Sequence, residues 1–328
     1  MLVTFSSSVR DDQQEMSALA VILPSVLKAI RVSALLMLVQ WTFANADEVL
    51  PELGNTLVGH EFVYTVQAGD SLTSIGARFA QSPAILASAN GLKRASKLSV
   101  GATLMIDNRH IVPRYDLPEG IVLNVPQRML FHFREGSLRA SYPVGLGRPD
   151  WPTPTGRFKV LRMQKDKEWI VPESIQEEMR QAGKEVLTHV SPGPENPLGR
   201  HWIGLSLKNI GIHGTIAPPS VYHFQSHGCI RLHPDDVAEL FANVAVGEAG
   251  EIVYQPLLMA QVDGRLYLEV QPDIYKRAAN PTATVRRIVA AQQLDTLVDW
   301  ARIDAVIAEQ AGLARDVGRV QSQNTEDN

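Results

Sequence analysis

The chain of 328 residues contains a single cysteine, Cys229, in the stretch S-H-G-C-I-R-L at residues 226–232. One thiol cannot form a disulfide within the chain, so the fold must rest on hydrophobic cores, and this length is typical of about two domains. In a secreted protein an unpaired cysteine indicates a reactive thiol; the alternative is a small buried apolar residue. His213 lies sixteen residues upstream in I-H-G-T, on a segment that one turn of chain can bring to the thiol.

The residue types around Cys229 are typical of acyl transfer. The thiolate is the reactive form of cysteine, and a nearby imidazolium lowers its pKa from about 8.5. We therefore expect His213 to hold the thiolate as an ion pair and to exchange protons with the leaving and incoming amines. Gly228 allows the backbone to approach a substrate closely, and the N–H groups of Gly228 and Cys229 are candidate donors to an oxyanion.

Other side chains near Cys229 leave alternatives open. His227, two residues away on an extended segment, shares a face with Cys229 and is a second candidate base. Arg231 either clamps a substrate carboxylate or ties down the loop. A zinc site built from His213, His227, Cys229 and His233 is disfavoured because the usual paired ligand spacing is absent, and we expect no metal or other cofactor.

The N-terminal region predicts export from the cytoplasm. Basic residues precede an apolar run at 32–41, and the small residues Ala44-Asn45-Ala46 follow. This pattern is typical of a signal peptide over residues 1–46, cleaved after its last residue. The run is shorter than the roughly 20 residues of a membrane span, so anchoring by this segment is the alternative. Because the residues before Met16 are polar and unpatterned, translation starts at either Met1 or Met16.

Residues 62–107 form a compact unit with the order strand, helix, helix, strand. Alternation predicts the first strand, Asp70 or Ser71 caps the first helix, Asn90-Gly91 ends the second, and Gly101 precedes the closing strand. With Y-x-V, G-D-S-L and G-x-x-L-x-I in this order, the unit resembles the LysM domain. The resemblance implies binding of N-acetylglucosamine-containing glycan, with Asp70, Ser71 and Asn90 as candidate contacts.

The sequence pattern of residues 119–255 predicts a second domain. Their first half alternates in runs separated by turns, which favours antiparallel strands. A short helix is expected over 173–182, a proline-rich loop over 191–199, and a further helix opening at Pro234 with acidic residues in its first turn. The net charge of −4 gives no electrostatic reason to expect a nucleic-acid partner.

The motifs I-H-G-T, S-H-G-C-I-R-L, P-T-P-T-G and N-P-L-G make residues 119–255 similar to the YkuD-type L,D-transpeptidase catalytic domain. The resemblance implies a mainly-β sandwich with Cys229 as nucleophile and His213 as base. It further implies that the Gly214 carbonyl orients the histidine and that three other residues shape the pocket: Ser226, Gly228 and Arg231. Within the family the position of His227 varies, which weakens its claim to be the base.

The resemblance also implies a reaction. Cys229 attacks the carbonyl of the third residue of a peptidoglycan tetrapeptide stem, usually meso-diaminopimelate, and expels the terminal D-alanine. The acyl-enzyme is then resolved by an amine, either on the diaminopimelate of another stem or on the C-terminal lysine of an outer-membrane lipoprotein. Water in place of the amine would give L,D-carboxypeptidase activity, and carbapenems are expected to acylate the same thiol. Such an enzyme works in the periplasm.

Residues 256–315 form a C-terminal extension. Two alternating runs flank V-D-G-R at residues 262–265, which predicts a hairpin, and amphipathic helices are expected over 281–293 and 300–311. We expect the helices to pack against the sandwich, with a partner surface or a place at the active-site rim as alternatives. Residues 316–328 are expected to be disordered. The whole layout is similar to the ErfK/YbiS/YcfS/YnhG group of Gram-negative envelope proteins.

Together these expectations describe an α+β multidomain chain with a βααβ LysM unit, a mainly-β catalytic domain and a hairpin-plus-helices extension. Two functions of different classes remain. The first is a cysteine acyltransferase, and the second is a wall-binding scaffold whose catalytic domain does not turn over. Intact Cys229, His213 and Gly228 favour the enzyme. The sequence does not choose between the two acceptors.

Overall fold

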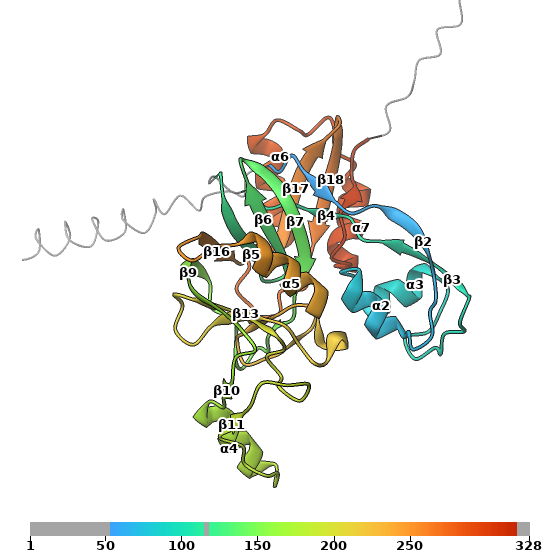
Figure 1. Cartoon of the computed structure of the whole chain (residues 1–328). Helices are drawn as coiled ribbons and strands as arrows, with labels where there is room; N and C mark the ends of the chain where they lie inside the picture. The colour runs from blue at the N-terminus through green and yellow to red at the C-terminus, as the bar shows by residue number, and fades with distance from the viewer. Residues whose placement is uncertain (1–52, 115–117, 320–328) are drawn as a thin grey trace, which may run out of the picture. The chain divides into compact units, whose positions relative to one another are not determined.

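A computed structural model of the protein describes residues 53–114 and 118–319 (Figure 1). The expected signal peptide, its cleavage site and residues 320–328 of the expected tail lie outside the described residues. Residues 316–319 are described, and Arg315–Asp316 forms a short strand, β19, with Val317 fully buried behind it. The extension therefore continues past residue 315, where the sequence pattern ends it.

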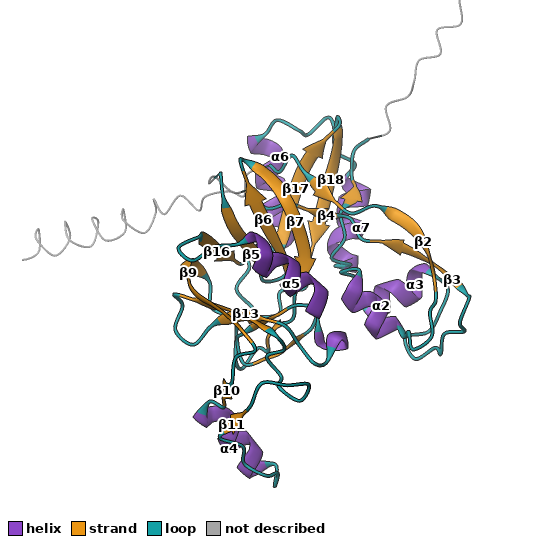
Figure 2. Cartoon of the chain, in the orientation of Figure 1, coloured by secondary structure: helices purple, strands orange, loops and turns teal. Residues whose placement is uncertain are grey.

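The LysM unit has the predicted order. Strand β2 (Glu61–Thr65) pairs antiparallel with β3 (Thr103–Asp107), and helices α2 (Leu72–Arg78) and α3 (Pro83–Ala89) lie between them in sequence (Figure 2). Apolar side chains that alternate on the strands and recur on the helices form a separate small core. Its buried members are Val66, Leu72, Ile75, Leu86, Ala87, Leu104 and Ile106.

The segment between the LysM unit and the catalytic domain contains a strand. His110–Ile111 (β4) pairs antiparallel with Leu57–Val58 (β1), and both residues of β4 are completely buried. The sequence pattern missed β4 because a two-residue strand is too short to show any periodicity.

An eight-stranded mixed sheet forms the catalytic domain, in the order β15-β13-β12-β9-β16-β5-β6-β7. The strands are β5 (Gly120–Asn124), β6 (Met129–Arg134), β7 (Ser137–Pro143), β9 (Gly156–Lys165), β12 (His201–Leu205), β13 (Gly211–His213), β15 (Ile230–Arg231) and β16 (Ala249–Val253). Two pairs, β16 with β5 and β13 with β15, are parallel rather than antiparallel. Alternation predicts strands but not the direction of pairing, so the sequence could not supply this difference.

One hydrophobic core joins strands from both ends of this sheet. It contains Leu130 and Tyr142 from the β6–β7 end together with Ile212 and Ile230 from the β13–β15 end, and helix α5 (Pro234–Asn243) adds two side chains. The sheet thus curls around its own core. The predicted mainly-β fold class is confirmed. A short parallel pair, β8 (Leu146–Gly147) with β14 (Phe224–Ser226), and a 3-10 turn, η1 (Pro218–Ser220), complete the domain.

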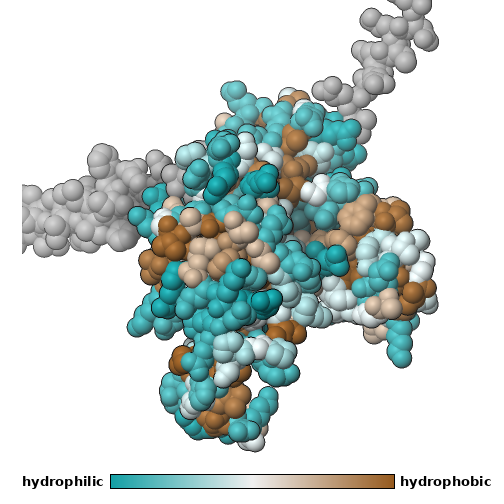
Figure 3. All heavy atoms as spheres, viewed as in Figure 1, coloured by the Kyte–Doolittle hydropathy of each residue, from teal (hydrophilic) through white to brown (hydrophobic). Residues whose placement is uncertain are grey.

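Between β9 and β12 an insertion leaves the sheet (Figure 1). It consists of β10 (Trp169–Ile170), helix α4 (Glu173–Gln181) and β11 (His189–Val190), and no residue of α4 is buried. Apolar side chains that are normally buried, such as Ile170, remain exposed on it (Figure 3). The predicted helix over 173–182 is therefore present, but it is attached by polar contacts rather than by a core.

The C-terminal extension forms its own core instead of packing on the sandwich. Strands β17 (Leu257–Val262) and β18 (Arg265–Val270) make the predicted hairpin around Asp263-Gly264, both with positive φ as a type I′ turn needs. The apolar faces of α6 (Pro281–Ala291) and α7 (Trp300–Glu309) cover this hairpin. The expected packing against the catalytic sheet is wrong, because the hairpin itself presents the complementary apolar face.

A buried carboxylate, Glu269 on β18, joins the three parts. Its oxygens accept from the Ile111 N–H at 2.7 Å and from the side-chain amides of Gln127 at 3.0 Å and Gln271 at 2.8 Å. His110 Nδ1 lies 2.9 Å from the same carboxylate, and its Nε2 donates to the Ala80 carbonyl at 3.0 Å. Because Glu269 is completely buried, its carboxylate is satisfied by these protein groups from all three parts.

Replacing Glu269 by glutamine is expected to lower the free energy of unfolding by about 3–5 kcal/mol, because an amide cannot accept from all of these donors and leaves buried groups unpaired. Chemical denaturation monitored by circular dichroism measures this. Glu251→Gln is the control, since Glu251 lies 3.9 Å from a highly exposed arginine and its loss is expected to cost under about 0.5 kcal/mol. Equal effects of the two substitutions would contradict the structural role given to Glu269.

Candidate active site

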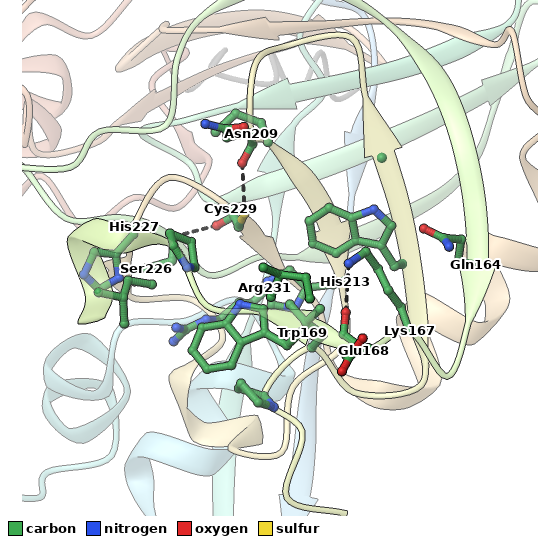
Figure 4. A pocket seen from close by; sticks show the side chains of 18 of the residues that line it. Gln164, Lys167, Glu168, Trp169, Asn209, His213, Ser226, His227, Cys229 and Arg231 are labelled. Carbon is green, nitrogen blue, oxygen red and sulfur yellow. Dashed lines mark hydrogen bonds between the residues drawn. The ribbon is translucent and has the colours of Figure 1, made fainter. Parts of the chain in front are cut away.

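The parallel pairing of β13 with β15 places the predicted catalytic residues on one face of the sheet. Ile212 lies beside Ile230, and both are fully buried in the core. Side chains alternate along a strand, so their neighbours His213, Arg231 and Cys229 face the other way. All three line one cavity of about 1160 Å³ (Figure 4).

The turn before Cys229 is fixed by two local features. Gly228 has φ of +98°, a conformation that side-chain-bearing residues rarely adopt. The Ser226 hydroxyl donates to the Cys229 carbonyl at 2.5 Å and accepts from the Gly228 N–H at 3.2 Å. The expected oxyanion donor Gly228 is therefore occupied within the turn. The Cys229 N–H has no acceptor among the residues described, and it is the available donor of the two.

The Cys229 thiol is not paired with an imidazole. Its sulfur lies 3.6 Å from the Asn209 carbonyl, to which the thiol donates. Burial raises the pKa of this thiol, and the Gly211 N–H and the charge of Arg231 oppose the rise only in part. At neutral pH the group is a thiol.

His213 has a defined tautomer. Its Nδ1–H donates to the Gly214 carbonyl at 2.6 Å, as the family resemblance implies, and this leaves the Nε2 lone pair for a substrate-side proton. The ring is only 4% exposed and stacks on Trp202, with ring centroids 5.7 Å apart. Burial, and then the charge of Arg231, lower the pKa of His213 to about 4, although the Gly214 carbonyl acts in the opposite direction.

The expected thiolate–imidazolium pair is therefore absent from this state of the protein. Both pKa shifts favour the neutral forms, because each group would have to be charged in a buried place. Both groups line the same cavity, but the described structure has no hydrogen bond between the Cys229 sulfur and the His213 ring. The sequence could not supply this result, since pKa values depend on burial.

His227 contacts the insertion. Its Nε2 lies 2.9 Å from a Glu178 oxygen on α4, and its ring packs edge-on against Trp151 at 5.3 Å. Glu178 also pairs with Arg148, and hydrogen bonds from Arg148 and His227 lower the pKa of this carboxyl. His227 thus ties α4 to the turn that bears Cys229. The geometry favours this role over that of a base.

Arg231 is half-buried beside the two catalytic candidates. Its register partner is His213, and its backbone is held by paired hydrogen bonds with Gly145, each 2.8 Å long. Among residues 53–114 and 118–319 its guanidinium has no carboxylate partner. His233 caps α5 by accepting from the Asp235 N–H at 3.4 Å.

Two residues missed by sequence reasoning hold the nucleophile turn from outside. The Thr153 hydroxyl donates to the Gly228 carbonyl at 3.0 Å, and the Thr153 N–H donates to the phenol oxygen of Tyr275 at 3.2 Å. Tyr275, from the C-terminal extension, donates in turn to the Gly147 carbonyl at 2.6 Å. Thr153 belongs to the P-T-P-T-G motif, so the sequence offered a reason to consider it. Nothing in the local sequence connects Tyr275 with a turn 47 residues earlier in the chain.

The three candidate glycan contacts in the LysM unit make hydrogen bonds within that unit. Asp70 accepts from the Tyr64 hydroxyl and the Gln67 N–H, both at 2.7 Å. Ser71 caps α2 in a capping box, and the Asn90 side chain bonds the backbone of Met105 in both directions. Structural roles therefore account for these side chains, and contact with glycan stays a prediction.

Within the part of the chain that the structure covers, no group of three or more His, Cys, Asp or Glu residues is placed to hold a metal ion. No helix in those same residues is long and apolar enough to span a membrane.

Sequence comparison places the chain among known proteins. The profile of the YkuD L,D-transpeptidase catalytic domain matches residues 118–254, and that of the LysM domain matches residues 64–107. The probable L,D-transpeptidase YcfS of Escherichia coli K12 is 30% identical over 286 residues, which cover 83% of this chain and 88% of YcfS. The chain belongs to the YkuD L,D-transpeptidase family. The probable L,D-transpeptidase ErfK/SrfK of Salmonella typhimurium is 28% identical over 80% of this chain and 88% of its own length.

Solved L,D-transpeptidases are more distant. L,D-transpeptidase 3 from Mycobacterium tuberculosis is 15% identical, with a TM-score of 0.33 over 63% of this chain and 96% of that chain. The Enterococcus faecium L,D-transpeptidase C442S mutant is 20% identical, with a TM-score of 0.34 over 42% of this chain and 50% of that chain.

The neutral state of this YkuD-family site predicts how Cys229 reacts with iodoacetamide. The thiol pKa is raised above 9.0, so the thiolate fraction and the alkylation rate are expected to rise continuously from about pH 5 to above pH 9. Mass spectrometry of the modified protein gives the rate at each pH. A stable thiolate–imidazolium pair would instead give a plateau between the two pKa values, and observing that plateau would refute the neutral pair.

Tyr275→Phe tests the contact between the extension and the nucleophile turn. Removing the phenol oxygen leaves the Thr153 N–H and the Gly147 carbonyl without a partner, which is expected to lower the free energy of unfolding by about 1–3 kcal/mol. Hydrogen exchange of the peptide containing residues 147–153 should also become faster. Tyr267→Phe is the matched control on β18, and unchanged exchange in the Tyr275 variant would argue against the contact.

Proposed function

We propose that this protein is a peptidoglycan L,D-transpeptidase in which Cys229 is the nucleophile and His213 the general base. The main support is that a thiol and a neutral imidazole lie on one face of adjacent strands, in the wall of one cavity, and that the Gly214 carbonyl holds Nδ1–H of the imidazole. The family profile over residues 118–254 supports the reaction class. Cysteine acyl transfer needs this nucleophile and base, and the chain contains no other cysteine.

In the acylation half, the Cys229 sulfur attacks the carbonyl carbon of the third residue of a tetrapeptide stem while His213 Nε2 takes the thiol proton. The carbonyl oxygen becomes an oxyanion, to which the Cys229 N–H can donate. Collapse of this intermediate breaks the bond to the terminal D-alanine, and the imidazolium gives its proton to the leaving amine. The products are a thioester on Cys229, free D-alanine and a neutral His213.

In the second half, an amine attacks the thioester carbonyl and His213 Nε2 takes the proton that this amine loses. The intermediate collapses with release of the Cys229 sulfur, which regains the proton from His213. The acceptor is either the diaminopimelate amine of a second stem or the C-terminal lysine of an outer-membrane lipoprotein. Water as acceptor would give the L,D-carboxypeptidase side reaction.

Because the resting pair is neutral, proton transfer accompanies attack instead of preceding it. A thiol without a local base would be a poor nucleophile at neutral pH. A substrate that displaces the Asn209 carbonyl as the acceptor of the thiol hydrogen frees that hydrogen for His213. Arg231, which faces the cavity beside His213, is suited to the carboxylate of the leaving D-alanine.

We assign peptidoglycan glycan to the LysM unit and the periplasm to the whole enzyme. The LysM profile at residues 64–107 supports the first assignment. The signal-peptide pattern over residues 1–46, with cleavage after Ala46, supports the second. These segments would bring the catalytic domain, residues 119–255, to the cell wall.

Incubation with a disaccharide-tetrapeptide tests the reaction. The wild type is expected to release D-alanine and to gain the mass of a carbapenem when that drug is added. Cys229→Ala should lose both, and His213→Gln should lower the rate by roughly 10²–10⁴-fold without altering the circular dichroism spectrum. If the folded wild type releases no D-alanine and forms no adduct, the enzyme hypothesis is wrong and the wall-binding scaffold is the remaining hypothesis.

Analysis of sacculi addresses the acceptor. Muropeptides from cells with and without the gene are compared after digestion. Loss of bonds between two third residues would indicate cross-linking between stems. Loss of protein-linked stems would indicate attachment of a lipoprotein.

A further inference from the structure

The strand register continues the Cys229 row of side chains across the sheet. Arg162 on β9 pairs with Gly204 on β12, and Gly204 pairs with Gly211 on β13. Cys229 immediately precedes Ile230, whose partner Ile212 immediately follows Gly211, so Cys229 comes next in the same row. The row therefore reads arginine, glycine, glycine, cysteine, and its middle carries no side chain.

The indole of Trp202 covers the two glycines. A Cβ placed on Gly211 would lie 2.3 Å from a carbon of the Trp202 six-membered ring, and one placed on Gly204 would lie 3.0 Å from the indole nitrogen. Glycine within a strand costs stability and commonly marks a close approach of a ligand or of another group. The two glycines thus let the Trp202 indole lie flat against the sheet between Cys229 and Arg162. This indole is called the floor below.

Arg162 extends over the far end of this floor. The same Cβ on Gly204 would lie 2.9 Å from Arg162 Cγ and 3.2 Å from its Nε. The guanidinium is thereby brought back over β12. It lies about two strand spacings, or roughly 10 Å, from Cys229. Subtracting an attack distance of roughly 3 Å and a charge-assisted hydrogen bond of roughly 2.8 Å leaves on the order of 4–5 Å of substrate.

Lys167 adds a second cation at this end. Its Nζ lies 5.4 Å from the centre of the Trp202 ring and donates to the Glu168 carbonyl at 2.9 Å (Figure 4). Burial, and then the charge of Arg162, lower the pKa of Lys167, while the carboxylate of Glu168 acts weakly in the other direction. Neither Arg162 nor Lys167 forms an ion pair with a carboxylate in the described residues. Two cations of this kind are suited to a carboxylate supplied by a ligand.

We propose that Arg162 and Lys167 form a subsite for a carboxylate on the side chain of the residue that acylates Cys229. This subsite deepens the proposed function and rests on it. The side-chain carboxylate of a diamino-dicarboxylic acid reaches this distance from the reacting carbonyl when the side chain bends along the floor. The carboxylate of the leaving residue is closer to the reacting carbon, and Arg231 is nearer to it.

The test compares three tetrapeptide stems. One has a free side-chain carboxylate on the third residue, one has that carboxylate amidated, and one has only its C-terminal carboxylate amidated. Values of kcat and KM for release of the fourth residue are measured for the wild type, for Arg162→Gln, Lys167→Gln and the double variant. Arg157→Gln, an exposed arginine on the same strand β9, is the control.

The wild type is expected to prefer the free side-chain carboxylate over its amide by roughly 10-fold or more in kcat/KM. The double variant should lose this preference because its rate on the free stem falls to that on the amide. Its discrimination against the C-terminal amide should stay unchanged, and Arg157→Gln should behave as the wild type. A variant that was merely damaged would slow on every stem by one factor and keep the preference.

Equal rates of the wild type on the free and side-chain-amidated stems would overturn the subsite, and so would a preference that survives in the double variant. If the double variant instead loses discrimination at the C-terminal carboxylate, the cations bind the leaving residue and the assignment is wrong. Absence of release from every stem would overturn the proposed function itself, and the subsite with it.

Discussion

The candidate site depends on one parallel strand pairing, that of β13 with β15. Ile212 and Ile230 are buried side by side in the core, and this fixes the register. A shift of β15 by one residue would turn Cys229 and Arg231 into the core and Ile230 into the cavity. Burial of two isoleucines, each contributing about 1.5–3 kcal/mol, thus stabilises the arrangement that the chemistry uses. The core and the site are two faces of the same two strands.

Burial also determines the protonation states. The sheet that aligns His213 with Cys229 buries the imidazole and half-buries the thiol, and each group then favours its neutral form. Among residues 53–114 and 118–319, Arg231 is the charge that acts on both groups, and it further disfavours an imidazolium and favours a thiolate. The positive charge of Arg231 favours negative charge in the pocket. In the proposed reaction that negative charge comes from the oxyanion and the carboxylates of the substrate. A resting thiol is also less prone to oxidation than a thiolate.

Much of the fold follows from local patterns. Alternation and turn residues predicted the LysM unit, most strands of the catalytic domain and the β17–β18 hairpin, because these depend on neighbours in sequence. The packing of α6 and α7 and the parallel pairing of β16 with β5 could not be predicted, since they depend on partners far along the chain. In the site, motif spacing identified Cys229 and His213, whereas the Glu178 contact of His227 and the support from Tyr275 arise only when the insertion and the extension are folded.

The departures from ordinary strand chemistry gather in one region. Gly204 and Gly211 weaken β12 and β13, and Trp202 buries an indole N–H that has no partner in the described structure. Lys167 lies near Arg162, and within the described residues neither is paired with an acid. The opposite face of the same strands, which carries Ile203 and Ile212, is filled by close-packed aliphatic side chains. Proteins tolerate such local costs where a ligand offsets them. The costs here line the cavity that contains Cys229, so the residues that destabilise the free protein are the ones that the proposed substrate would contact.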